Sequence, residues 1–172
     1  MECDKLRRST VGVIMYRAYI VYSLLLSLFL AAPSFAEEVE SAIAIPTTGK
    51  AYLAYNATRE GVTVLKSGLQ YEVLKSGEGA TPRRRDNVVT HYRGSFIDGK
   101  EFDSSYKRNK PAEFPVKGVI PGWTEALLKM KEGDKWRLVI PYKLAYGKKG
   151  YGPIPARSTL IFEMELIEVK KR

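Results

Sequence analysis

From residue 67 onward, short apolar runs alternate with turn signals along the chain, and this pattern predicts β-strands. Leu69, Tyr71 and Val73 share one face of the first predicted strand. A longer run, NVVTHYRGSF at 87–96, ends before the hairpin dipeptide Asp98-Gly99. Further strands are predicted at 101–103, 113–116, 135–140 and 159–169. The pattern predicts five or six antiparallel strands.

The segment 121–131 breaks the strand pattern, because its apolar positions repeat at helical spacing. Four apolar side chains gather on one face: Trp123, Ala126, Leu127 and Met130. Pro121 favours a helix start, and Gly133 favours a stop just after the segment. We therefore expect an α+β fold, a bent five- to six-stranded antiparallel half-barrel sheet wrapped around one short amphipathic helix.

The first 36 residues resemble a secretory signal peptide, because basic residues precede an uncharged apolar stretch at 18–32. Small residues at Ser34 and Ala36 predict cleavage after Ala36, and Met15 is an alternative start. An uncleaved membrane anchor is the alternative, although Arg17 interrupts it. Residues 37–66 form a short N-terminal lead-in, partly helical (50–60) or flexible, and residues 67–172 form the main domain.

Composition narrows the class of protein further. The chain has 172 residues, 45% of them apolar, which excludes a large multidomain enzyme and a multi-span membrane protein. Its formal net charge is +9, and removal of the predicted signal, with four basic and two acidic residues, leaves +7. The run Arg83-Arg84-Arg85 is short and precedes Asp86, so we interpret it as a solvated loop and expect no nucleic-acid partner.

Groups that usually carry catalysis are scarce. The single cysteine, Cys3, lies in the predicted signal, and the single histidine, His91, lies within a predicted strand and is interpreted as structural. Asp103 has no partner base or nucleophile, so we expect it to be a polar anchor. No metal site and no cofactor are expected. Asn56-Ala57-Thr58 is a glycosylation acceptor only if the host is eukaryotic.

Aromatic residues, in contrast, recur at the ends of the predicted elements: Tyr92, Phe102, Phe114, Trp123, Tyr146 and Phe162. Each one alone is explained by core packing. Together with Val119, Ile120 and Ile154 they could line an apolar pocket, with Asp103 and the tyrosine hydroxyls as polar groups.

Three long strings carry a family resemblance: VVTHYRGSFIDGKEFDSSY at 88–106, GVIPGWTEALLKMKEGDKWRLVIP at 118–141 and LAYGKKGYGPIPARSTLIFEMELI at 144–167. They resemble the FKBP-type peptidyl-prolyl cis-trans isomerases. The segment SGLQYEVLKSGEG at 67–79 is typical of the Mip-like (macrophage infectivity potentiator) secreted branch. The family fold, a bent antiparallel sheet around one short helix, agrees with the prediction from the pattern.

The resemblance implies a role for each aromatic position. Trp123 would form the floor beneath a proline ring, and the walls would be Tyr92, Phe102, Val119, Ile120 and Phe162. The Ile120 N–H and the Tyr146 hydroxyl would donate hydrogen bonds to peptide carbonyls, and Asp103 would lie at the rim. Phe114 and Ile154 would contact substrate, with Ile154 on the loop over the mouth.

The resemblance also implies an activity, isomerisation of X-Pro bonds in proline-containing polypeptides during folding of secreted proteins, and binding of macrolides of the FK506/rapamycin type. A non-catalytic holdase or peptide-binding module is the alternative. Two departures from the family pattern, Ala112 and the short connection Lys117-Gly118, affect the expected sequence preference. We expect a monomer that is secreted or resides in a periplasm or secretory lumen, and the resemblance also implies interaction with a host.

Overall fold

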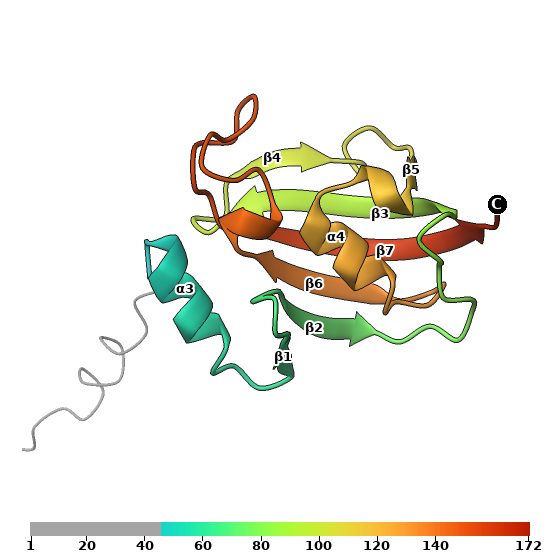
Figure 1. Ribbon diagram of the computed structural model, residues 1–172, viewed down its shortest axis with the longest axis horizontal. Coiled ribbons are helices and arrows are strands. Elements are labelled where there is room, and N and C mark those ends of the chain that lie inside the picture. Colours follow the sequence, from blue (N-terminus) through green and yellow to red (C-terminus); the bar gives the residue numbers. More distant parts are fainter. Residues whose placement is uncertain (1–45) are drawn as a thin grey trace, which may run out of the picture. The chain divides into compact units, whose positions relative to one another are not determined.

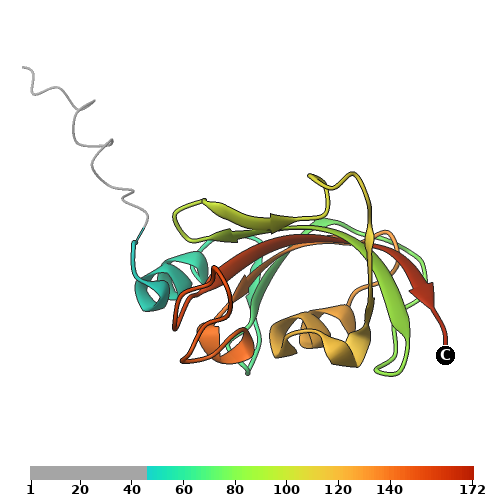
Figure 2. The ribbon, with the colours of Figure 1, turned by 90° about the horizontal axis from the view of Figure 1, so that it is seen from above.

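The structure, a computed structural model, describes residues 46–172, so the predicted signal peptide and residues 37–45 of the lead-in lie outside it. An antiparallel sheet of seven strands curves around one short helix, α4 (Figure 1). Viewed from above, the sheet arches over α4 (Figure 2). The strands follow the order β1-β2-β6-β7-β3-β4, and β5 pairs with β3 outside this path. The α+β half-barrel prediction is confirmed.

The elements have the following bounds. The strands are β1 Val62–Val64, β2 Gln70–Lys75, β3 Asn87–Phe96, β4 Glu101–Ser104, β5 Ala112–Pro115, β6 Lys135–Ile140 and β7 Leu160–Lys170. The helices are α3 Gly49–Asn56 and α4 Pro121–Leu127, with short 3₁₀ turns η1 Val116–Gly118 and η2 Tyr142–Leu144.

The centre of the sheet is the long pair β3 and β7, in register from Asn87 opposite Lys170 to Phe96 opposite Leu160 with one shift after Val89. Even-numbered positions of β3 point into the concave side, which gives its alternating burial. The apolar face of α4 fills that side. Gly122 permits the close approach, because a Cβ there would lie 2.6 Å from Ile140 Cγ2.

Helix α3 covers the other face of the sheet, where Tyr52 packs against Val139 and Ile161. Its last residue, Asn56, is only 2% exposed and donates from Nδ2 to Gln70 Oε1 at 2.8 Å. Gln70 Nε2 in turn donates to the Leu53 carbonyl at 2.8 Å. The folded domain buries the Asn56 amide and uses it in a hydrogen bond, so a glycan on this residue would conflict with the observed packing.

Two features of the fold differ from the expectation. Strand β1, within the predicted lead-in, pairs with β2 and extends the sheet to seven strands, because Gly61 and Gly68 at positive φ allow the chain to reverse. Helix α4 ends at Leu127 rather than near Lys131, although hydrogen bonds from Leu128 and Met130 continue one further turn. Among residues 46–172, no helix is long and apolar enough to cross a membrane.

Candidate functional site

A small aromatic cavity opens on the concave side of the sheet, beside the start of α4. Its volume is about 290 Å³, which suits one ring-sized group and its flanking main chain. The residues that line it are Tyr92, Phe102, Asp103, Phe114, Gly118, Val119, Ile120, Trp123, Tyr146 and Phe162. Nine of the ten predicted site residues therefore lie around one cavity, and only Ile154 does not.

Trp123 is the hub of the aromatic lining. Its ring meets Tyr92, Phe114 and Phe162 edge to face, with centroids 5.1, 5.7 and 5.2 Å away. Edge-to-face contacts fix the angle of each ring, because the positive edge of one ring faces the negative face of another. The side chain is 4% exposed, and its Nε1–H has no hydrogen-bond partner among the described residues. The cavity thus has an apolar aromatic lining, in which the Trp123 Nε1–H is an unpaired donor.

Two predicted hydrogen-bond donors lie beside these rings. Ile120 is the N-cap of α4, and its carbonyl accepts from the N–H groups of Trp123 and Thr124. The Ile120 N–H itself donates to no other residue within 46–172. The Tyr146 hydroxyl likewise makes no hydrogen bond within this range, and burial raises the pKa of Tyr146, so it stays protonated. Both donors are available to a bound peptide.

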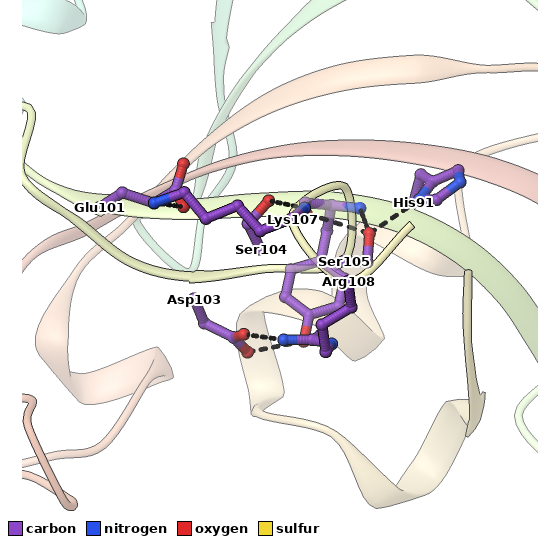
Figure 3. A network of polar contacts seen from close by, with 8 residues as sticks. His91, Glu101, Asp103, Ser104, Ser105, Lys107 and Arg108 are labelled. Carbon is purple, nitrogen blue, oxygen red and sulfur yellow. Dashed lines mark hydrogen bonds and ion pairs between the residues drawn. The ribbon is translucent and has the colours of Figure 1, made fainter. Parts of the chain in front are cut away.

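A polar cluster at the rim joins Asp103 to Arg108 (Figure 3) and to Tyr92. The Tyr92 hydroxyl donates to Asp103 Oδ2 at 2.6 Å, Arg108 Nη1 donates to Asp103 Oδ1 at 2.5 Å, and Arg108 Nη2 donates to the Tyr92 hydroxyl at 2.8 Å. Burial by itself would raise the pKa of Asp103, but the hydrogen bonds from Tyr92 and Arg108 outweigh it and hold the pKa below its ordinary value. Asp103 is therefore a carboxylate that accepts hydrogen bonds.

His91 lies behind this wall and outside the cavity. Its Nδ1 lies 2.9 Å from Ser105 Oγ, and its ring stacks on Tyr106 with centroids 4.5 Å apart. Ser105 is fully buried and accepts from the Tyr92 N–H at 2.7 Å, so it fixes the backbone of Tyr92. These contacts agree with the structural role that the sequence predicts for His91.

The loop after β6 presents a pair of stacked tyrosines at the cavity mouth. The rings of Tyr146 and Tyr151 are nearly parallel, 12° apart, with centroids separated by 5.5 Å. Tyr151 and Ile154 exchange both main-chain hydrogen bonds at 2.9 Å, which holds the loop in a tight hairpin. The Ile154 side chain is 6% exposed and packs in the core, so it anchors the loop from below while Tyr151 is 70% exposed.

Three residues of the site were not predicted. Arg108 pairs with Asp103 from a turn five residues later, Tyr151 stacks on Tyr146, and Gly118 lines the cavity. No pattern in the sequence marks Arg108 or Tyr151, because turn and loop conformation alone bring them to the rim. Ala112 does not line the cavity, and Phe114, on the same face of β5, supplies a ring there.

A larger cavity, about 560 Å³, lies on the opposite face of the sheet near the start of α3. Several charged side chains line it, among them Arg93, Arg137 and Glu163 on adjacent strands, and Tyr52 is its single aromatic ring. Within residues 46–172, no group of three or more His, Cys, Asp or Glu side chains is placed to hold a metal ion. The aromatic cavity remains the better candidate, because its walls are rigid and its polar groups converge.

Comparisons with known proteins agree with this site. The family model for FKBP-type peptidyl-prolyl cis-trans isomerases matches residues 78–167, and the model for the domain amino terminal to such isomerases matches residues 30–73. The FKBP-type 22 kDa isomerase of Escherichia coli K12 is 56% identical over 127 residues, 73% of this chain and 62% of that protein.

Two further relatives extend the comparison. Outer membrane protein MIP of Legionella longbeachae is 49% identical over 124 residues, 72% of this chain and 53% of that protein. The crystal structure of FkpA from Escherichia coli aligns with a TM-score of 0.70 and 40% identity, covering 97% of this chain and 73% of that one. The chain spans less than two thirds of the length of these two curated relatives. With the family model covering the whole cavity, the chain belongs to the FKBP-type peptidyl-prolyl cis-trans isomerase family.

Proposed function

We propose that the protein accelerates cis-trans rotation of X-Pro bonds in polypeptides. The observation that carries this proposal is the aromatic cavity itself: about 290 Å³, floored by Trp123 and bordered by two unpaired donors, Ile120 N–H and Tyr146 Oη–H. Its polar groups are tyrosines and a hydrogen-bonded carboxylate rather than a nucleophile with a base. This arrangement suits a reaction in which no covalent bond forms or breaks.

Rotation about an X-Pro bond is slow because it breaks amide resonance, at a barrier of about 18–20 kcal/mol. At the twisted transition state the amide has lost charge separation, so its carbonyl depends less on water than in the planar ground state. A dry pocket therefore favours the twisted form, which is the differential binding that catalysis requires. Lowering the barrier by about 7 kcal/mol would accelerate rotation by roughly five orders of magnitude.

Each group of cavity residues has its own role in binding the proline peptide. The proline ring lies on Trp123, enclosed by Tyr92, Phe102 and Phe162. The Ile120 N–H and the Tyr146 hydroxyl donate to peptide carbonyls and fix one side of the rotating bond. Asp103, held by Tyr92 and Arg108, keeps the Tyr92 ring in place and presents a polar edge at the rim. The same apolar cavity would accept the ring system of a macrolide of the FK506/rapamycin type.

The isomerisation of short proline peptides by residues 37–172 tests the proposal directly. We expect the rate of cis-to-trans conversion to rise in proportion to protein concentration. Binding of the same peptides without any change in the isomerisation rate would contradict the enzyme and favour the holdase alternative. The exposed ring of Tyr151 beside the cavity is the observation that supports the alternative, because it offers apolar contact to extended chains.

Export and a monomeric state complete the proposal. We infer that residues 1–36 direct secretion and are removed, which leaves a lead-in at 37–66 and an isomerase domain at 67–172 that acts on folding clients outside the cytoplasm. One chain supplies a complete set of lining residues for the cavity, so the site does not require a second copy, and we propose a monomer. The mass of the purified protein in solution, measured by light scattering, tests this state.

A further inference from the structure

A second, shallower groove adjoins the aromatic cavity along the outer side of α4. Its volume is about 340 Å³, and it is bordered by two cations, Arg84 and Lys117, and by one acid, Glu125. Val119 lines both this groove and the aromatic cavity. The groove and the aromatic cavity therefore adjoin at this residue.

Arg84, the middle residue of the arginine run that the isomerase site does not use, lines one side of this groove. The run lies in a tight turn, in which the Asp86 N–H donates to the Arg83 carbonyl at 3.0 Å and Asp86 Oδ2 accepts from the Arg83 N–H at 2.8 Å. Asp86 is 2% exposed, and its Oδ1 accepts from the Arg172 N–H at 3.2 Å. The carboxylate that follows the arginines in sequence is thus turned inward and bonded to main-chain N–H groups.

Hydrogen bonds hold this turn against the segment that enters the active cavity. The Val116 N–H donates to the Asp86 carbonyl at 3.0 Å, and Thr124 Oγ1 donates to the Val116 carbonyl at 2.8 Å. Val116 is fully buried and begins η1, which carries Lys117 and leads to Val119. The side chains of Arg84 and Lys117 therefore project from two segments that are locked to each other and to α4.

The positive charge of this groove favours an acidic ligand. Within residues 46–172, neither Arg84 nor Lys117 forms an ion pair, and Arg83 and Arg85 add positive charge beside them. Glu125 lines the groove, and the Asp86 carboxylate lies close enough to Arg83 and Arg85 for their charges to lower its pKa; with two acids against four cations, positive charge remains in excess. Building on the proposed isomerase function, we propose that this groove is a subsite for an acidic side chain of the polypeptide whose proline occupies the aromatic cavity.

The distance from the proline limits where that acidic residue lies. An extended chain advances about 3.3 Å per residue, and the two cavities share Val119, so we expect the acidic residue to lie roughly two to four positions from the proline. The protein therefore prefers client segments in which Asp or Glu flanks proline at this separation.

The test compares matched peptides that differ only in one flanking residue. Glu, Gln and Lys are placed in turn at each position two to four residues before and after the proline, at physiological salt, where screening acts over about 8 Å. For the wild type we expect kcat/KM to be about three- to tenfold higher with Glu than with Gln at one of these positions, and lower with Lys. In the double variant Arg84→Glu/Lys117→Glu, this preference should reverse, so that kcat/KM is higher for the Lys peptide than for the Glu peptide.

The control is the double variant Arg83→Glu/Arg85→Glu, which changes the net charge equally in the same turn but away from the groove lining. It should keep most of the wild-type preference for Glu. Equal rates for Glu and Gln peptides at every position in the wild type would overturn the subsite, as would equal loss of preference in both double variants. If even the Gln peptides are not isomerised, the isomerase proposal fails, and equilibrium binding of the same peptides then decides the subsite separately.

Discussion

At the scale of single residues, the rim carboxylate Asp103 is held in one protonation state by its neighbours. The Tyr92 hydroxyl and the Arg108 guanidinium both donate hydrogen bonds to this carboxylate. The guanidinium carbon of Arg108 also lies over the Tyr92 ring, 5.7 Å from the ring centroid. Burial raises the pKa of Tyr92, so its hydroxyl remains a donor at neutral pH. The polar rim of the cavity is thus constant in charge over a wide range of pH.

A flat pH profile follows from this constancy. The folded-state pKa of Asp103 lies below its unfolded value of about 3.9, so its ion pair stabilises the fold above that pH and is lost as pH falls through the lowered pKa. We expect kcat/KM for a neutral proline peptide to vary less than about threefold between pH 5 and 9. A tenfold change per pH unit within this window would indicate acid-base catalysis instead.

Three substitutions separate catalytic from structural side chains. Trp123→Ala removes the floor of the cavity, so we expect kcat/KM to fall about 100-fold. Tyr146→Phe removes only a hydroxyl, so we expect a smaller fall of about 5- to 20-fold. His91→Ala should lower the free energy of unfolding by about 1 kcal/mol, through loss of the Ser105 and Tyr106 contacts, with little change in the rate per folded molecule.

Isomerase assays paired with thermal unfolding measure both quantities. Equal loss of rate in all three variants, with folding intact, would contradict these roles.

At the scale of elements, strand β3 controls how close two walls of the cavity come to each other. Gly94 lies beneath the rings of Phe102 and Phe162, which meet edge to face with centroids 5.6 Å apart. A Cβ at this position would come within 2.7 Å of both rings. The missing side chain at position 94 is what lets β4 and β7 bring their aromatic residues together over β3.

Gly94→Ala should therefore displace the rings of Phe102 and Phe162, which line the cavity. Because both rings must move, we expect a loss of about 1–3 kcal/mol in the free energy of unfolding and at least a tenfold fall in kcat/KM. The neighbouring Ser95 points to the opposite face of the strand, so Ser95→Ala serves as the matched control and should change either quantity little. For each variant, chemical denaturation measures the free energy of unfolding and the peptide assay measures kcat/KM. Wild-type activity in Gly94→Ala would show that the walls are less tightly coupled.

At the scale of the whole molecule, the N-terminal sequence predicts export of the protein. We expect the exported protein to begin at Glu37, since the small residues Ser34 and Ala36 precede it in the spacing of a cleavage site. N-terminal sequencing of the protein after expression in its host measures this. A chain that retains residues 18–32 and sediments with membranes would instead support the uncleaved anchor.

The periodicity of apolar residues was sufficient to predict the strands from β2 to β7 and the position of α4, because burial on one face imposes a period of two or 3.6 on a local stretch of chain. It did not predict β1, whose three residues are too few to show a period. The aromatic cavity could be predicted because its rings stand in long family motifs, from Tyr92 on β3 to Phe162 on β7.

By itself the sequence determined the half-barrel, its helix and nine of the residues around the cavity, since these depend on local pattern and on motifs shared by a family. Only the tertiary structure decided that Arg108 pairs with Asp103, and that Tyr151 stacks on Tyr146 while Ile154 is buried. It also decided that the Asp86 carboxylate bonds to main-chain N–H groups, and that Arg84 and Lys117 line the same groove. These contacts join separate turns and loops, where main-chain hydrogen bonds set the direction of each side chain. Because turns and loops have no regular spacing of apolar residues, the sequence pattern does not predict these contacts.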